Sequence, residues 1–103
     1  MSTIFGHRLK MLREDKQIPQ RQIASVLEID TATYCKIEKG DRRAKREQIL
    51  QLANFLQTDS KELLRLWSAD KVYDIIANED EATQILTVVA ENIVTNKRQK
   101  AKL

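Results

Sequence analysis

Apolar residues recur along most of the chain at the three- and four-residue spacing of amphipathic helices. This spacing predicts six helices, over residues 3–16, 20–27, 31–39, 46–57, 60–77 and 79–96. No segment shows the alternation of apolar and polar residues that is typical of strands, and no internal repeat or interdomain linker is visible. The pattern therefore predicts an all-α protein.

Residues at the predicted helix boundaries have the chemistry of helix ends. Pro19 suits the start of the second helix, where its missing N–H leaves no hydrogen bond unmade. Asp30 is the expected N-cap of the third helix, because its carboxylate can accept the unpaired N–H groups of the first turn. Gly40 tolerates the positive φ of a helix C-cap and is expected to end that helix. Asp59, with Glu62 three residues later, resembles a capping box.

Composition argues against several classes of function. The two glycines, Gly6 and Gly40, are isolated and cannot form a phosphate-binding loop or a dinucleotide fingerprint. One His and one Cys are too few for a zinc site, so no metal or other cofactor is expected. The single Cys cannot form an internal disulfide, which favours a cytoplasmic location. No apolar run approaches the roughly 18 residues needed to cross a bilayer, and no nucleophile–base pair suggests an enzyme.

Charge is distributed unevenly along the chain. Residues 1–46 carry a net charge of +5, residues 47–96 carry −6 and residues 97–103 carry +4, within an overall charge of +3. A basic N-terminal half favours a polyanion as the partner of one face. The same charges are also compatible with an ordinary solvated helical surface.

Residues 20–39 match the helix-turn-helix pattern, in which two short helices are joined by a tight turn. Ala24 is small at the position where the two helices would cross closely. The positions expected to be buried are apolar: Ile23, Leu27, Ile29, Tyr34 and Ile37. This geometry makes the second helix protrude, so that it fits a major groove about 12 Å wide.

The first 66 or so residues resemble the Cro/repressor (XRE-type) DNA-binding domain, which is a five-helix bundle. The resemblance rests on Gln20, the Ala24 crossing, Ile29-Asp30 before the second helix of the motif, and the ending Ile37-Glu38-Lys39-Gly40. The whole sequence also resembles small bacterial regulators of this type, some of which accompany restriction–modification genes.

Three further positions are informative within this resemblance. Arg13 and Glu38 fall where the family has an ion pair that joins its first and third helices. Glu28 stands where the turn usually has Gly, and a positive φ there would cost roughly 1 kcal/mol in a residue with a side chain. We therefore expect the turn to differ slightly from the family pattern. Pro19 replaces the usual Ser or Thr cap, which affects where the second helix begins.

The resemblance implies DNA contacts for the exposed residues around the second helix of the motif. Base contacts are implied for Thr31, Ala32, Thr33 and Lys36. Phosphate contacts are implied for Gln20, Lys39, Arg42, Arg43 and Arg46. The alternative interpretations are a solvated basic loop at 42–46 and simple helix-start chemistry for the two threonines. Cys35 lies on the same helix, and a redox role for it stays open.

The residues that follow carry more apolar surface than a five-helix core needs. We expect a DNA-binding domain over residues 1–66, a dimerisation extension over residues 67–96 and a basic tail over residues 97–103. The expected dimer interface comprises Leu66, Trp67, Tyr73, Ile76, Ile85 and Val89. Pairing these helices across a two-fold axis would cover them, whereas the alternative is that they fold back onto their own monomer.

The predicted function is sequence-specific binding of double-stranded DNA by a homodimeric transcriptional regulator. The simplest form is a repressor or autoregulator that reads a pseudo-palindromic operator through the helix 31–39. DNA and a second copy of the chain are the expected partners, with no membrane and no small-molecule ligand. The alternative is an antitoxin or another interaction module whose C-terminal helices bind a partner protein. The neighbouring gene would distinguish the two.

Overall fold

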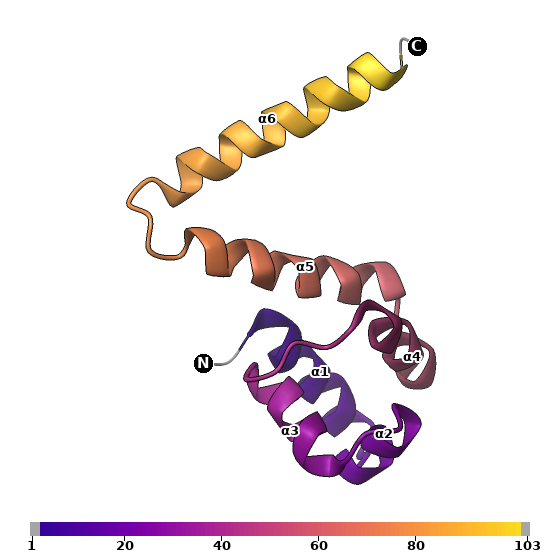
Figure 1. Cartoon of the computed structure of the whole chain (residues 1–103). Helices are drawn as coiled ribbons and strands as arrows, with labels where there is room; N and C mark the ends of the chain where they lie inside the picture. Colours follow the sequence, from indigo (N-terminus) through magenta and orange to yellow (C-terminus); the bar gives the residue numbers. More distant parts are fainter. Residues whose placement is uncertain (1–2, 102–103) are drawn as a thin grey trace. The chain divides into compact units, whose positions relative to one another are not determined.

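The computed structural model describes the backbone of residues 3–101 and the side chains of residues 3–97. Within those residues the chain forms six α-helices and no β-strand (Figure 1), which confirms the predicted all-α class. The helices are α1 (Ile4–Asp15), α2 (Gln20–Val26), α3 (Thr31–Lys39), α4 (Arg46–Leu56), α5 (Ser60–Ile76) and α6 (Ala82–Ala101).

The largest differences from the predicted helix ends are at α6. This helix begins at Ala82 rather than at residue 79, and it continues to Ala101 rather than ending at residue 96. The backbone of residues 97–101 is therefore helical, where a separate basic tail was expected. Residues 102–103 of that tail lie outside the described residues.

The chain divides into two compact units, of which the first ends at Lys71 and the second begins at Val72. Helix α5 contributes to both units, because it runs from Ser60 to Ile76. The expected boundary at residue 66 therefore lies within α5.

The first unit has one apolar core to which all five of its helices contribute. Helix α3 packs against both α1 and α2, and α2 also packs against α4. The buried core side chains are Phe5, Leu9, Ile23, Ala24, Leu27, Tyr34, Ile37, Ala44, Ile49, Leu52, Ala53, Leu56 and Leu63. Each large side chain buried in this way contributes roughly 1.5–3 kcal/mol of hydrophobic stabilisation. Of the motif positions expected to be buried, Ile29 is half-buried and the others are fully buried.

Helices α1 and α3 approach closely at Gly6. A Cβ atom at this position would collide with the backbone carbonyl oxygen of Glu38 and would lie 2.8 Å from Oγ1 of Thr3. The space beside Gly6 is therefore occupied by backbone, which cannot move aside as a flexible side chain could. This glycine is required for packing, a role that its isolation in the sequence does not reveal.

The N-terminus of α1 is capped from two sides. The Thr3 hydroxyl accepts a hydrogen bond of 2.9 Å from the Gly6 N–H. The buried carboxylate of Asp70, on α5, accepts hydrogen bonds of 3.0 Å from the N–H groups of Ile4 and Phe5. A carboxylate is favourable here because it satisfies free N–H groups and faces the positive end of the helix dipole. Asp70 thus fixes α5 to the start of α1.

Three helix-end predictions have different outcomes. Asp30 caps α3 as expected, since its carboxylate accepts a hydrogen bond of 2.6 Å from the Thr33 N–H. Gly40 ends α3 with φ of 84°, also as expected. The capping box at α5 is not formed. Asp59 accepts from the Lys61 N–H at 3.0 Å, but Glu62 instead accepts from Nε of Arg8 at 3.0 Å. The Glu62 carboxylate, which the local sequence pattern assigned to the cap of α5, therefore pairs with Arg8 on α1 instead.

The second unit contains the end of α5 and all of α6. Its large apolar side chains are mostly exposed: Val72, Tyr73, Ile75, Leu86, Val88, Val89, Ile93 and Val94. Ile76 is buried and Ile85 is half-buried. As for membrane insertion, none of the helices in the described part of the chain combines the length and apolarity that crossing a bilayer requires.

Candidate nucleic-acid interface

Helix α3 has one face in the core and the opposite face in solvent. Tyr34, Ile37 and Glu38 are buried, at the one-turn spacing of a single helical face. The residues expected to contact bases lie mainly on the other face. Thr31, Ala32 and Lys36 are exposed, and Thr33 is half-buried beside the Asp30 cap. The structure therefore brings three of these four residues together on an accessible surface.

The turn between α2 and α3 adopts the left-handed conformation despite lacking glycine. Glu28 has φ of 57°, and the Ile29 N–H donates to the Ala24 carbonyl oxygen at 3.0 Å. Glu28 therefore takes a positive φ of the kind that glycine adopts without strain. The surrounding helix packing holds a residue with a Cβ in a conformation that costs about 1–2 kcal/mol.

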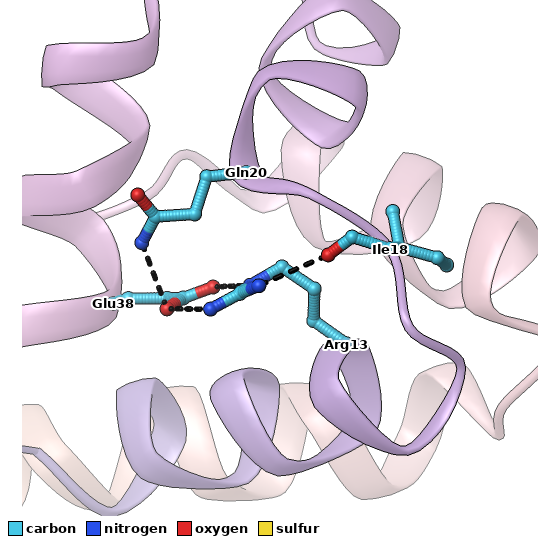
Figure 2. Close-up of polar contacts among 4 residues, drawn as sticks. All are labelled: Arg13, Ile18, Gln20 and Glu38. Carbon is cyan, nitrogen blue, oxygen red and sulfur yellow. Dashed lines mark hydrogen bonds and ion pairs between the residues drawn. The ribbon is translucent and has the colours of Figure 1, made fainter.

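A buried polar cluster fixes α3 to α1 and α2 (Figure 2). Arg13 on α1 donates to Glu38 on α3, from Nε to Oε2 at 2.6 Å and from Nη2 to Oε1 at 3.2 Å. Its remaining Nη1 donates to the carbonyl oxygen of Ile18 at 2.9 Å. Nε2 of Gln20, the first residue of α2, donates to Oε1 of Glu38 at 3.1 Å. The structure thus contains the Arg13–Glu38 ion pair and joins it to a third helix.

The cluster changes the protonation of its members. Burial acts to raise the pKa of Glu38, but the interactions of its carboxylate with Arg13, Tyr34 and Gln20 together outweigh burial and hold the pKa below its ordinary value. The hydrogen bond to Glu38 raises the pKa of Arg13. Burial, reinforced by the same carboxylate, raises the pKa of Tyr34. All three groups therefore keep their ordinary charge near neutral pH, and the carboxylate remains ionised although it is buried.

Comparison with known protein families identifies the family to which this arrangement of helices α1–α5 belongs. The family model described as a helix-turn-helix domain matches residues 4–74, which is more than half of the chain. The chain belongs to the XRE-type helix-turn-helix family. A helix-turn-helix domain is a module that docks one helix in the major groove, so DNA is the partner of this chain.

One curated relative is similar in sequence over most of this helix-turn-helix protein. It is the protein named uncharacterized HTH-type transcriptional regulator YqaE of Bacillus subtilis (strain 168). The two are 29% identical over 83 residues, which cover 81% of this chain and 67% of the relative. No solved structure matches the chain significantly.

The four basic residues expected to contact phosphates lie at the C-terminal end of α3, in the loop that follows it and at the first position of α4. Lys39, Arg42, Arg43 and Arg46 are all exposed. The Asp41 N–H donates to the carbonyl oxygen of Lys36 at 2.9 Å, which turns the chain sharply after α3. Gln20 differs from these four residues, because its side-chain amide points into the polar cluster rather than toward solvent (Figure 2).

Trp67 on α5 organises this basic loop. Its Nε1–H donates to the carbonyl oxygen of Ala44 at 2.8 Å. The Arg43 guanidinium lies 3.9 Å from the centroid of the indole ring, and its Nη1 donates to the Trp67 carbonyl oxygen at 2.9 Å. The Arg46 guanidinium lies 5.3 Å from the same centroid. Two of the expected phosphate-contacting side chains are therefore positioned by cation–π contacts.

Sequence reasoning placed Trp67 and Leu66 in a dimer interface and did not link them to the loop. In the structure both are half-buried and pack against the core of the first unit. The available signal was the tryptophan itself, whose large ring and single N–H donor call for a partner when they are not in solvent. Its partners lie more than twenty positions earlier in the chain, beyond the range of helical periodicity.

The remaining chemistry of the helix-turn-helix domain is limited. Within the residues that the structure describes, no group of His, Cys, Asp and Glu side chains is arranged to hold a metal ion. A hollow lined from α1, α2 and α3 is formed by His7, Lys10, Gln20, Cys35, Glu38 and Lys39. Cys35 is half-buried at this hollow and forms no disulfide.

Proposed function

We propose that this protein is a sequence-specific transcriptional regulator that binds a pseudo-palindromic operator as a homodimer and acts as a repressor or autoregulator. The observation that carries the proposal is the presentation of α3, with Thr31, Ala32 and Lys36 in solvent and the opposite face fixed to two other helices. The name of the relative, a transcriptional regulator, supports the same function.

Each exposed residue of α3 has a chemical role in this proposal. Lys36 donates to guanine O6 or N7, and the threonine hydroxyls donate to or accept from base edges. The methyl group of Ala32 packs against a thymine methyl group. Lys39, Arg42, Arg43 and Arg46 contact phosphates, and Gln20 contacts a phosphate from the start of α2 once its amide turns outward.

A homodimer follows from the information content of one helix. A single recognition helix reads only a few base pairs, whereas two copies related by a two-fold axis read half-sites about 10–11 base pairs apart. The exposed apolar side chains of the second unit, Tyr73 and Val89 among them, supply surface for the pairing.

Selection of bound fragments from random double-stranded DNA tests this function with the full chain. We expect enrichment of a two-fold symmetric sequence with half-sites about one helical turn apart. Affinity for the selected sequence should fall steeply with salt and exceed that for random DNA by at least about a thousandfold. Recovery of unrelated sequences with equal affinity would contradict the proposal. A purified chain that is monomeric would instead favour a partner protein on the second unit.

A further inference from the structure

Helix α6 carries an apolar stripe, defined here as Ala82, Ile85, Leu86, Val89 and Ile93. These residues recur at three- and four-residue intervals and so lie on one side of the helix. Leu86, Val89 and Ile93 are 41%, 47% and 50% exposed, although all are large apolar side chains. Glu91 is the one charged residue between positions 82 and 96, and it lies on the side opposite the stripe.

The two ends of the stripe have opposite charge. Glu79, Asp80 and Glu81 precede α6 directly, and all three are exposed. At the other end, exposed Lys97 begins a run that also contains Arg98, Lys100 and Lys102. The stripe is therefore an uncharged segment between an acidic end and a basic end.

We propose that α6 pairs with α6 of a second copy in antiparallel orientation, so that the acidic end of each helix lies beside the basic end of its partner. The proposal rests on the homodimer of the proposed function and adds which helix pairs and in which direction. The ends of a helix of this length are roughly 30 Å apart, well beyond the Debye length of about 8 Å at physiological salt. Each end therefore interacts only with the end beside it.

Orientation then follows from the sign of the charges. A parallel pair would place three acidic residues beside three acidic residues at one end and basic residues beside basic residues at the other. An antiparallel pair replaces both repulsions with attractions, and it also places opposite ends of the two helix dipoles together.

The apolar stripe is compatible with this direction. The midpoint between the acidic end and the basic end falls at Val89, in the middle of the stripe. A two-fold axis through Val89 and perpendicular to the helices places Ile85 of one copy opposite Ile93 of the other. Ala82 then lies opposite Asn96, so a small side chain faces the polar residue. The central residues Ile85, Val89 and Ile93 are thus matched with one another, whereas Leu86 lies opposite Asn92 in the same register. The two halves of the interface are identical, as a two-fold axis requires.

Charge reversal at the two ends tests the direction. The acid-reversed variant is Glu79→Lys with Asp80→Lys and Glu81→Lys, and the base-reversed variant is Lys97→Glu with Arg98→Glu and Lys100→Glu. Sedimentation equilibrium of the full chain at low salt should show dimers about tenfold weaker for each variant. The chain that carries all six changes should regain a dissociation constant within about threefold of the original. Absence of this rescue, or no weakening by either single set, would overturn the proposal.

Disulfide cross-linking gives a second, geometric readout. In chains that also carry Cys35→Ser, a mixture of Ala82→Cys and Asn96→Cys chains should cross-link to each other and not to themselves. Cross-linking of Ala82→Cys chains among themselves would indicate a parallel pair and overturn the proposal. A parallel dimer would overturn the antiparallel pairing and leave the proposed function intact. A monomeric unmodified chain would overturn both the pairing of α6 and the homodimer of the proposed function.

Discussion

At the level of single residues, the position of α3 depends on Glu38. Its buried carboxylate receives hydrogen bonds from α1 through Arg13 and from α2 through Gln20. Breaking a buried ion pair by removing one partner leaves the other charge uncompensated and costs about 3–5 kcal/mol. Because the partners come from both neighbouring helices, loss of Glu38 should loosen the helix that faces DNA.

The lowered pKa of Glu38 makes part of this stability depend on pH. A carboxyl group with a pKa lowered by folding stabilises the folded state fully above its ordinary value of 4.5, and this contribution is lost as pH falls through the lowered value. We expect Glu38→Gln to reduce the free energy of unfolding by about 3 kcal/mol near pH 7 and by clearly less near pH 3. Urea denaturation at both pH values measures the two differences.

Glu62→Gln is a matched control for this experiment. Glu62 also accepts from an arginine, Arg8, but both side chains are about one-third exposed. Solvent weakens such a pair, so the change should cost less than about 1 kcal/mol at either pH. An equal loss of unfolding free energy in the Glu38→Gln variant at both pH values would show that ionisation of Glu38 does not contribute to stability.

Gly6 gives a second residue-level prediction. Gly6→Ala should destabilise the protein by about 1–3 kcal/mol, because the added methyl group meets the backbone carbonyl of Glu38. This loss should occur even though alanine favours helices more than glycine does by about 1 kcal/mol. Thermal unfolding measures the change, and Ser25→Ala, at an exposed position of α2, should be nearly neutral. A stabilised Gly6 variant would mean that α1 and α3 are less closely packed.

At the level of elements, the α2–α3 turn keeps a strained residue. Glu28→Gly removes the Cβ that opposes a φ of 57° and should raise the free energy of unfolding by about 0.5–1 kcal/mol. Gln22→Gly, at an exposed position within α2, should lower it by about 1 kcal/mol. Denaturant titration distinguishes the two signs. Destabilisation by both changes would indicate that the Glu28 side chain makes a compensating interaction.

The elements also separate what sequence could predict from what it could not. Helical periodicity and the local signals at Asp30 and Gly40 were sufficient for α3, whose observed bounds are the predicted ones. The Arg13–Glu38 pair was accessible only through the family resemblance. The capping box at α5 failed because Glu62 pairs with Arg8, which lies 54 positions away. Local rules describe competition within one turn, and they contain no information about a partner that tertiary folding brings close.

The same argument applies to the candidate interface. Exposure of Thr31, Ala32 and Lys36 follows from the helical face that the apolar pattern buries. The contacts of Arg43 and Arg46 with Trp67 do not follow from any pattern, because they require the loop after α3 to meet α5. The sequence thus predicts which face of α3 is exposed to solvent. It does not predict that Trp67 holds the loop after α3 in place.

At the level of the whole molecule, base contacts and phosphate contacts should respond differently to mutation. Lys36→Ala should reduce the preference for the selected operator over its base-substituted variants by about 1–3 kcal/mol. Arg42→Ala should weaken binding to all sequences alike and reduce the slope of log affinity against log salt by about one. Fluorescence anisotropy over a salt series measures both quantities. An equal loss on specific and random DNA for Lys36→Ala would contradict its role in base readout.

The hydrogen bonds from Ile4 and Phe5 to Asp70 have a consequence for where the chain can be cut. They connect the first helical turn to a carboxylate 65 and 66 positions later, so that residues near the two limits of the first unit hold each other in place. A protease that cleaves after Lys71 should release a fragment that still melts cooperatively. Trimming that fragment by only two more residues would remove the Asp70 carboxylate and allow the beginning of α1 to unwind.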